Sequence, residues 1–187
     1  ATINETNVRE IIYNWNGSNF TIYNSSLSLY MNLDNNSFLD ENDSNVIDNS
    51  IYGNKGTFFG NVLWNSSGKY GHGVEFDGTN DWIKINDHDS LDGTQFFTYE
   101  SWVYDRGNDA LARGIASKRV SSGDTTNYAF AIFLFTNRYI YFDIAGSVDR
   151  HNSATALTAN QWNHIVVTFD GTAPVGERKK FYINGVL

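Results

Sequence analysis

The sequence predicts an all-β protein, a sandwich or jelly roll of antiparallel strands. Helical periodicity is almost absent, and the best candidate, residues 4–15, is too short for a convincing helix. From residue 72 onward, short strand-like runs follow one another with turn residues between them. The chain has one proline and sixteen glycines, so its turns depend on Gly, Asn and Asp. Many strands without intervening helices are typical of a sandwich or jelly roll.

The N-terminal segment is predicted to form a hairpin. Residues 10–24 (EIIYNWNGSNFTIYN) read as two short strands about Asn16-Gly17, a pair that tolerates positive φ. Residues 26–34 (SLSLYMNLD) place Leu27, Leu29 and Met31 on one face, which predicts a further strand.

The regular series of strands begins at residues 72–78 (HGVEFDG). This run is predicted to point Val74 and Phe76 inward and to close on the turn pair Asp77-Gly78. The strands predicted after it cover residues 81–87, 96–105, 114–119, 127–137, 138–146, 161–171 and 179–187.

Two features predict where the core lies. Residues 129–135 (AFAIFLF) are apolar on both faces, as expected of a strand buried between two layers. Trp82, Trp102 and Trp162 all fall within predicted strands, and we expect their indoles to fill the core rather than to bind sugar.

Length, charge and cysteine content limit the functional classes. A chain of 187 residues is most simply one domain, large enough to bury roughly 70% of its unfolded surface. A net charge of −8 argues against nucleic acid as a partner, because phosphate binding needs a basic surface. Without cysteine, the chain has no disulfides and no thiolate metal sites. It also has no apolar run of about 18 residues, so membrane insertion is not predicted.

Asparagine is unusually frequent, with 24 residues, half of them in the first fifty positions. Seven asparagines stand in N-x-[ST] sequons within the first 65 residues. They are Asn4, Asn16, Asn19, Asn24, Asn35, Asn42 and Asn65. This clustering favours a glycosylated, extracellular or cell-surface protein. A compositional habit of the source genome is the alternative.

Several motifs together form a specific pattern: SLYMNLDNN, VIDNSIYGNKGTFFG, FDGTNDWI, FTYESWV, WNHIVVTFDG and FYING. In this order they resemble the laminin-G-like jellyroll family of the concanavalin A-like lectin and glucanase superfamily. The resemblance covers residues 27–187 and implies a concanavalin A-like jelly-roll β-sandwich of two antiparallel sheets. Residues 1–26 look like the lead-in strand that precedes such domains in archaeal surface proteins.

Domains of this family usually continue past a segment such as NGVL with further strands. The resemblance therefore implies that the domain at residues 27–187 lacks its last strands. Three explanations stay open: the chain ends early, the strand REIIYNW takes the missing place, or another chain supplies it. Because an uncovered sheet edge invites strand addition, self-association is one expected interaction.

The resemblance also implies a calcium site. The counterpart of VIDNSIYGNKG in the family is an Asp-rich turn that can hold calcium, and calcium takes six to eight oxygen ligands. The ligands implied here are Asp48, Asn49, Ser50 and Asn54. The alternative is an Asx turn that joins two strands and binds no metal.

Catalytic motifs are missing from the sequence. Neither the E-x-D-x-x-E strand of retaining glucanases nor a G-x-S-x-G or H-E-x-x-H motif occurs, and Glu100 stands alone beside Trp102. The leading hypothesis is a non-catalytic binding or adhesion module that recognises a glycan through loop aromatics, namely Tyr52, Trp64 and Tyr70. The alternatives are a structural subunit of a surface layer or filament, contacting another surface protein, and a glycoside hydrolase.

Overall fold

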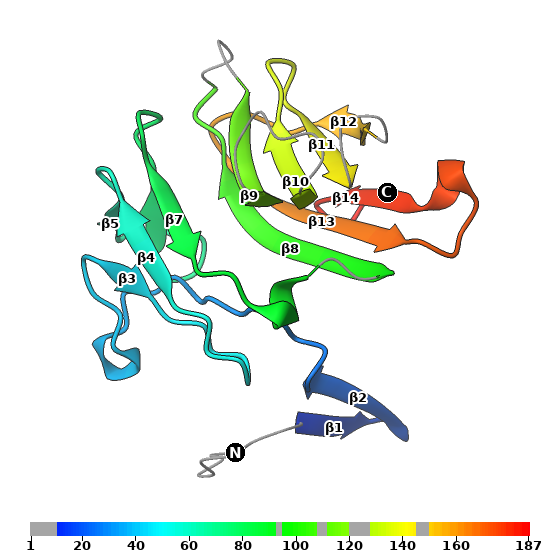
Figure 1. Ribbon diagram of the computed structural model, residues 1–187, viewed down its shortest axis with the longest axis horizontal. Helices are drawn as coiled ribbons and strands as arrows, with labels where there is room; N and C mark the ends of the chain where they lie inside the picture. The colour runs from blue at the N-terminus through cyan, green and yellow to red at the C-terminus, as the bar shows by residue number, and fades with distance from the viewer. Residues whose placement is uncertain (1–10, 93–94, 108–111, 120–127, 145–149) are drawn as a thin grey trace. The chain divides into compact units, whose positions relative to one another are not determined.

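The computed structural model describes residues 11–92, 95–107, 112–119, 128–144 and 150–187. The chain divides into two compact units, residues 1–91 and 92–187 (Figure 1). Both are built from antiparallel strands and single 3₁₀ turns, and no α-helix occurs in the described ranges. The all-β prediction is confirmed. The expected domain boundary after residue 26 stays a prediction.

The unit of residues 92–187 is a sandwich of two antiparallel sheets. One sheet has the order β12-β11-β10-β9 and the other the order β14-β13-β8. The strands are β8 (Phe96–Tyr104), β9 (Arg113–Arg119), β10 (Tyr128–Leu134), β11 (Tyr139–Ile144), β12 (His151–Ala156), β13 (Trp162–Asp170) and β14 (Lys179–Ile183).

The core of this unit lies between the two sheets. Alternate residues of β10 and β11, among them Ile132 and Phe142, face alternate residues of β13 and β14, among them Ile165 and Phe181. Nine apolar residues are buried there: Ile132, Leu134, Ile140, Phe142, Leu157, Ile165, Val167, Phe181 and Ile183. Because successive side chains in a strand point to opposite faces, each of these strands also has an outer face.

A buried ion pair marks the outer face of the sheet β12-β11-β10-β9. The Asp143 carboxylate, whose side chain is 1% exposed, accepts hydrogen bonds from Arg150 Nε and Nη2 at 2.9 and 2.8 Å. The guanidinium also lies over the Phe133 ring, 5.1 Å from its centroid, and Phe133 stacks on Tyr141. This bidentate pairing satisfies a carboxylate that burial would otherwise make costly.

The described residues of the first unit, 11–91, form three separate groups of strands. The hairpin β1 (Ile11–Trp15) and β2 (Ser18–Tyr23) turns at Asn16 and Gly17, both at positive φ, as the sequence predicts. A three-stranded sheet has the order β3 (Asn45–Val46), β4 (Gly56–Phe59) and β7 (Trp82–Ile85), and β5 (Leu63–Asn65) pairs with β6 (Gly73–Glu75).

Close packing inside the sheet β3-β4-β7 requires glycine at position 56. A Cβ added to Gly56 would lie 2.7 Å from a methyl carbon of Val46 and 2.7 Å from one of Ile83.

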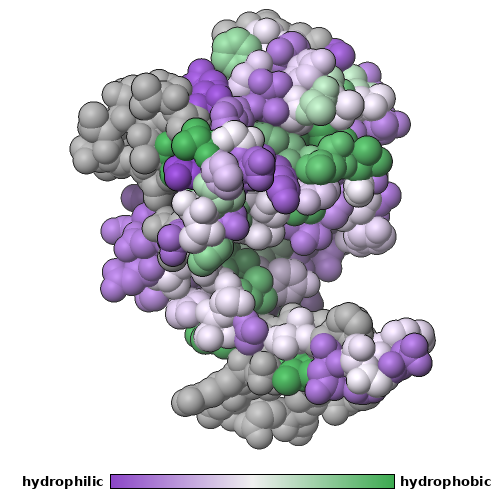
Figure 2. All heavy atoms as spheres, turned by 90° about the vertical axis from the view of Figure 1, so that its right-hand side faces the viewer, coloured by the Kyte–Doolittle hydropathy of each residue, from purple (hydrophilic) through white to green (hydrophobic). Residues whose placement is uncertain are grey.

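Exposed apolar residues occur elsewhere on the chain, and the face seen in Figure 2 mixes apolar and polar residues rather than forming one continuous apolar area.

Two sequence predictions about this unit are wrong. Residues 26–34 do not form a strand, because their backbone bonds to the turn around Asp48 instead of to a neighbouring strand: the Tyr30 N–H donates to Asp48 Oδ1. The Tyr30 carbonyl accepts from the Asn49 N–H. Phe76 does not point inward but is 46% exposed, because β6 already ends at Glu75.

We predict that replacing Arg150 by alanine lowers the free energy of unfolding by about 2–4 kcal/mol, because it leaves the buried Asp143 carboxylate without its partner. The value is below that for a fully buried pair because the Arg150 side chain is 39% exposed. Urea unfolding followed by tryptophan fluorescence measures the effect. The control is Glu177→Ala at an exposed turn, which should change stability by less than about 0.5 kcal/mol; equal losses in the two variants would contradict this role of the pair.

Acid sensitivity is expected at Asp81. Hydrogen bonds from the Asp77 N–H and the Asn61 N–H, both 2.6 Å, lower the pKa of this carboxyl. A group whose pKa is lower in the folded state stabilises the fold above its unfolded pKa, and that contribution disappears as the pH falls through the folded value. An NMR titration should therefore place the Asp81 midpoint below about 3.9. A midpoint at or above this value would show that these bonds do not hold the turn in solution.

Candidate functional site

The outer face of β8 carries a row of exposed residues. Inner residues such as Phe97 and Val103 pack against the core, whereas the alternate residues face outward. The outward residues are Phe96, Thr98, Glu100, Trp102 and Tyr104. A sheet face with several exposed aromatic rings is unusual, because large apolar side chains are normally withdrawn from water.

Strand β13 extends this row into a ladder of rings. In the antiparallel register Trp162 lies opposite Tyr104, and His164 lies opposite Trp102. The Tyr104 and Trp162 rings meet edge to face with centroids 5.6 Å apart, and the Trp102 and His164 rings are 4.9 Å apart. We call Trp102, Tyr104, Trp162 and His164 the aromatic ladder. Its rings hold one another in place across the two strands.

Polar groups flank the aromatic ladder. His164 Nε2 lies 2.8 Å from Glu100 Oε1, and the His164 N–H donates to Asn184 Oδ1 at 2.9 Å. Strand β14 adds Tyr182 opposite Val166 and Lys180 opposite Thr168 on the same sheet. Ligand sites usually combine apolar rings with a few polar groups. For a sugar, the rings would stack on its apolar face and the polar groups would hydrogen-bond to its hydroxyls.

The aromatic ladder corrects the expectation that the indoles fill the core. Trp102 is 36% exposed and Trp82 is 48% exposed, and Trp162 lies on the outer face opposite Tyr104. Trp82 stacks on Phe59, its cross-strand neighbour, with centroids 5.3 Å apart and ring planes at 7°. The sequence already indicated that Trp102 faces outward, because the alternation in β8 puts it on the same face as the polar residues Thr98 and Glu100.

The carboxylates on this face do not form a hydrolytic pair. Along β13 the other carboxylate, Asp170, lies four residues from the position opposite Glu100, which is about 13 Å in a strand. Glycosidases need their two carboxylates about 5–9.5 Å apart. Hydrogen bonds from the Thr172 hydroxyl and backbone N–H lower the pKa of Asp170, the opposite of what a general acid needs.

The residues expected to bind calcium do come together around Asp48. Both oxygens of this buried carboxylate already accept hydrogen bonds: Oδ1 from the N–H groups of Tyr30 and Ser50, and Oδ2 from the Ser50 hydroxyl and the Asn54 N–H, all at 2.8 Å. Four donors aimed at one carboxylate suit an Asx turn better than a cation, since a cation would have to displace them. In this arrangement the donor set does not fit calcium, and the metal stays a prediction.

The other expected ligands take part in the same turn. Asn54 Nδ2 donates to Ser90 Oγ at 3.1 Å and to the Ser28 carbonyl at 3.4 Å, and the Asn49 N–H donates to Tyr30. Nowhere in the described part of the chain do three or more His, Cys, Asp or Glu side chains gather as a metal site would require.

The three aromatic residues expected to bind a glycan, Tyr52, Trp64 and Tyr70, differ in their contacts and in their exposure. The Tyr52 hydroxyl donates to the Ser25 carbonyl at 2.8 Å, and Trp64 Nε1 donates to the Asn42 carbonyl at 3.0 Å while its ring packs on Phe58. Tyr70 is 70% exposed, with Lys69 Nζ 5.6 Å from its ring centroid. Tyr70 is therefore the most accessible of the three. Trp64 lies in strand β5, opposite Val74, and not in a loop as the sequence suggested.

Asn4 lies outside the described residues, and the other six sequon asparagines are all exposed or half-buried. In Asn24, Asn42 and Asn65 the side-chain oxygen accepts the N–H of the sequon serine at 2.8–2.9 Å. Asn65 Nδ2 also donates to Glu75 at 2.7 Å, a bond that a sugar on this nitrogen would disturb. Glycosylation of these sites stays a prediction.

The motifs and the two-sheet architecture agree with a comparison against known families. The laminin-G family model described as the concanavalin A-like lectin/glucanases superfamily matches residues 77–187. The chain belongs to this superfamily. Comparisons with curated proteins and with solved structures gave no significant match.

Membership of the superfamily confirms the family resemblance over residues 77–187 and the jelly-roll sandwich, whereas the likeness to archaeal surface proteins stays a prediction. Its laminin-G-like domains are generally non-catalytic binding modules and commonly extracellular, although the superfamily also includes glycosidases. In the part of the chain that the structure covers, no helix has the length and apolar character needed to span a bilayer.

We predict that Asp48→Ala destabilises the protein by about 2–4 kcal/mol in the presence of a chelator, because at least three backbone N–H groups lose their acceptor. Thermal and urea unfolding in EDTA measure this directly. If calcium holds the turn instead, the wild type and the variant unfold alike in EDTA and differ only when calcium is added.

Proposed function

We propose that this chain is a non-catalytic carbohydrate-binding module of a secreted or cell-surface protein, and that it binds a glycan along the aromatic ladder. The observation that carries the proposal is the set of rings on the outer face of β8 and β13, of which Trp102 and Tyr104 are exposed. The ring centroids within each cross-strand pair lie 4.9 and 5.6 Å apart. Exposed rings of this kind are costly to keep in water, so their retention favours a ligand that covers them.

The geometry of the aromatic ladder favours an extended sugar chain. The pairs Tyr104–Trp162 and Trp102–His164 are two residues apart along each strand, which is about 6.6 Å. Consecutive sugar units could therefore meet consecutive pairs, with Glu100 and His164 as hydrogen-bonding groups. Adhesion then follows from multivalent contact with a glycan-bearing surface.

Several features support binding without catalysis. Laminin-G-like domains are generally non-catalytic, and among the described residues of β8 and β13 the other carboxylate on this face, Asp170, lies beyond hydrolytic distance from Glu100. The cluster of sequons in the first 65 residues supports a glycoprotein outside the cell. A calcium requirement is not part of the proposed binding mode.

The test is glycan binding by the wild type and by single-ring variants. Trp102→Ala and Tyr104→Ala should each weaken binding about three- to tenfold, since one aromatic contact is worth about 0.5–1.5 kcal/mol. A glycan array selects the ligand, and calorimetry with the selected oligosaccharide measures the affinities, with and without EDTA.

Tyr70→Ala is the matched control, because it removes an exposed ring outside the aromatic ladder. Its affinity should equal that of the wild type. Loss of binding in Tyr70→Ala with full binding in Trp102→Ala would move the site to the loops of residues 1–91. An array without any bound glycan would contradict the proposed function.

A further inference from the structure

The aromatic ladder occupies one end of a longer outer face. Strand β8 has nine residues, and its outward residues, which stand at every second position, are all exposed. Trp102 and Tyr104 lie at one end of this row, and Phe96, which is 60% exposed, lies at the other. Residues of a strand are about 3.3 Å apart, so about 26 Å separates Phe96 from Tyr104. Aromatic rings therefore stand at both ends of one exposed row.

Polar side chains lie between these rings. Thr98 and Glu100 are exposed in β8, and Thr98 lies opposite Thr168 of β13. Strand β14 adds Lys180, which is exposed and lies opposite Thr168 on its other side. Hydroxyl, carboxylate and ammonium groups donate to sugar hydroxyls or accept from them. The face thus has rings, then polar groups, then a ring along β8.

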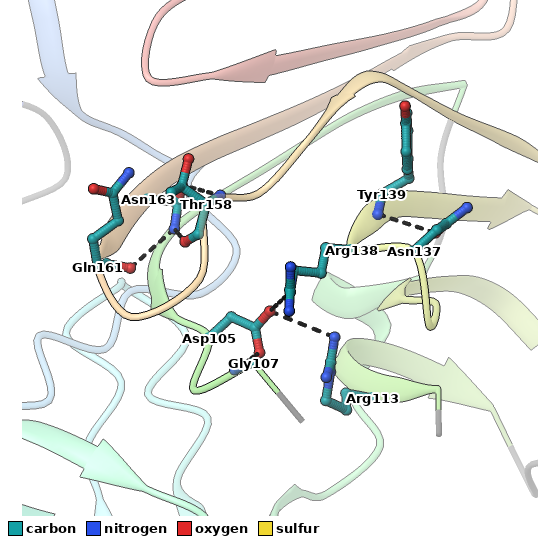
Figure 3. Close-up of polar contacts among 9 residues, drawn as sticks. All are labelled: Asp105, Gly107, Arg113, Asn137, Arg138, Tyr139, Thr158, Gln161 and Asn163. Atoms are coloured by element: carbon teal, nitrogen blue, oxygen red, sulfur yellow. Dashed lines mark hydrogen bonds and ion pairs between the residues drawn. The ribbon is translucent and has the colours of Figure 1, made fainter. Parts of the chain in front are cut away.

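Hydrogen bonds fix the end of the face that carries the aromatic ladder. Immediately after β8, the Asp105 carbonyl accepts the Asn160 N–H at 2.7 Å. Asn163, fully buried, donates from Nδ2 to the carbonyls of Thr158 and Gln161 at 2.9 Å each, which holds the turn that leads into β13 (Figure 3). This end of the face is therefore formed before any ligand binds.

The other end of the face is held in the same way. The Gln95 carbonyl, immediately before Phe96, accepts the Gly171 N–H at 2.8 Å, immediately after β13. A Cβ added to Gly171 would lie 3.1 Å from the Gln95 carbonyl oxygen, so the two chain segments are in close contact. The register of β8 and β13 therefore sets the distance between Phe96 and the aromatic ladder. Rings held at a fixed distance lose little further entropy when they bind.

We propose that Phe96 is a second anchor of the glycan site, so that the ligand is a linear sugar chain long enough to reach from the aromatic ladder to Phe96. The inference rests on the proposed function and specifies the length and course of its ligand. The sugar chain runs along β8, because the outward residues of β8 are exposed whereas those of β13 are half-buried. Rings at each end stack on sugar units, and the polar residues between them hydrogen-bond to hydroxyls.

A length series of oligosaccharides tests the inference. Calorimetry on the full chain uses cello-, manno- and xylo-oligosaccharides, each from the disaccharide to the octasaccharide. In a series that binds, the affinity of the wild type should rise with length and level off once the ligand reaches both anchors. The contact with Phe96 should account for about a three- to tenfold gain in affinity, as expected for one aromatic contact.

Single-residue variants assign this gain to the ring of Phe96. Phe96→Ala should bind the octasaccharide about three- to tenfold more weakly than the wild type and should lose nothing with the disaccharide, which is too short to reach position 96. Trp102→Ala should weaken the binding of both ligands, because both use the aromatic ladder. Phe96→Tyr keeps the ring and should retain most of the gain with length.

Phe38→Ala is the matched control, because it removes a phenylalanine that is 97% exposed and lies in the other unit. It should bind every length as the wild type does. Urea unfolding of each variant shows whether the fold is retained.

Two calorimetric results overturn the inference and leave the proposed function standing. One is equal affinity of the wild type and Phe96→Ala for the octasaccharide, and the other is an equal loss in Phe96→Ala with both ligand lengths. Self-association of the wild type that Phe96→Ala abolishes, measured by sedimentation, also overturns it, because a second copy then covers this end of the face. Failure of the proposed function gives a different result: Trp102→Ala then binds every length as the wild type does, or no oligosaccharide binds at all.

Discussion

The alternation of side chains in β8 and β13 is the constraint on which the unit of residues 92–187 depends. One set of side chains, Phe97 and Val103 with Ile165 and Val167, fills the space between the sheets. The other set must then face outward, whatever its polarity, because a shift of one residue would exchange the two faces. The core therefore fixes the register of the aromatic ladder, and the rings on the outer face need no separate device to align them.

Buried polar side chains stabilise places that the apolar core does not reach. Asp143, inside β11, binds Arg150. Asn163 holds the turn before β13, and Asp48 accepts four hydrogen bonds from three residues. Asn163 and Asp48 replace backbone pairing where the chain has no strand to pair with, and all three side chains would be costly to leave unsatisfied. Asp105 likewise lies within 3.5 Å of Arg113 and Arg138, two arginines that come from the opposite sheet.

The sequence predicted the strands that are long and rich in large apolar residues, and it missed strands that are short or polar. Strands β8 and β13 have nine residues each and alternate between the two faces, and β10 has seven residues that are apolar on both faces. The missed strand β12 consists of small and polar residues, of which only Ser153 is buried, and β3 has two residues. The opposite error at residues 26–34 arose because alternation alone does not show whether a neighbouring strand is present.

The candidate site was harder to predict because its members come from different parts of the sequence. Trp102 and His164 are 62 positions apart and meet through strand register. The prediction that the indoles fill the core followed the general tendency of large aromatic side chains to be buried. That tendency does not indicate which face of a strand packs against the other sheet. The polar neighbours Thr98 and Glu100 carried that information.

The net charge of the whole chain does not describe each of its two units. Residues 92–187 contain nine acidic and nine basic residues, so the net charge of −8 belongs entirely to residues 1–91. A global value that argues against polyanions therefore describes residues 1–91 and not the unit that carries the aromatic ladder, where charges beyond about 10 Å are screened at 0.1 M salt. Nucleic acid remains a poor candidate for this unit too, because nucleic acid is bound through about six to ten phosphate contacts and residues 92–187 have no net positive charge.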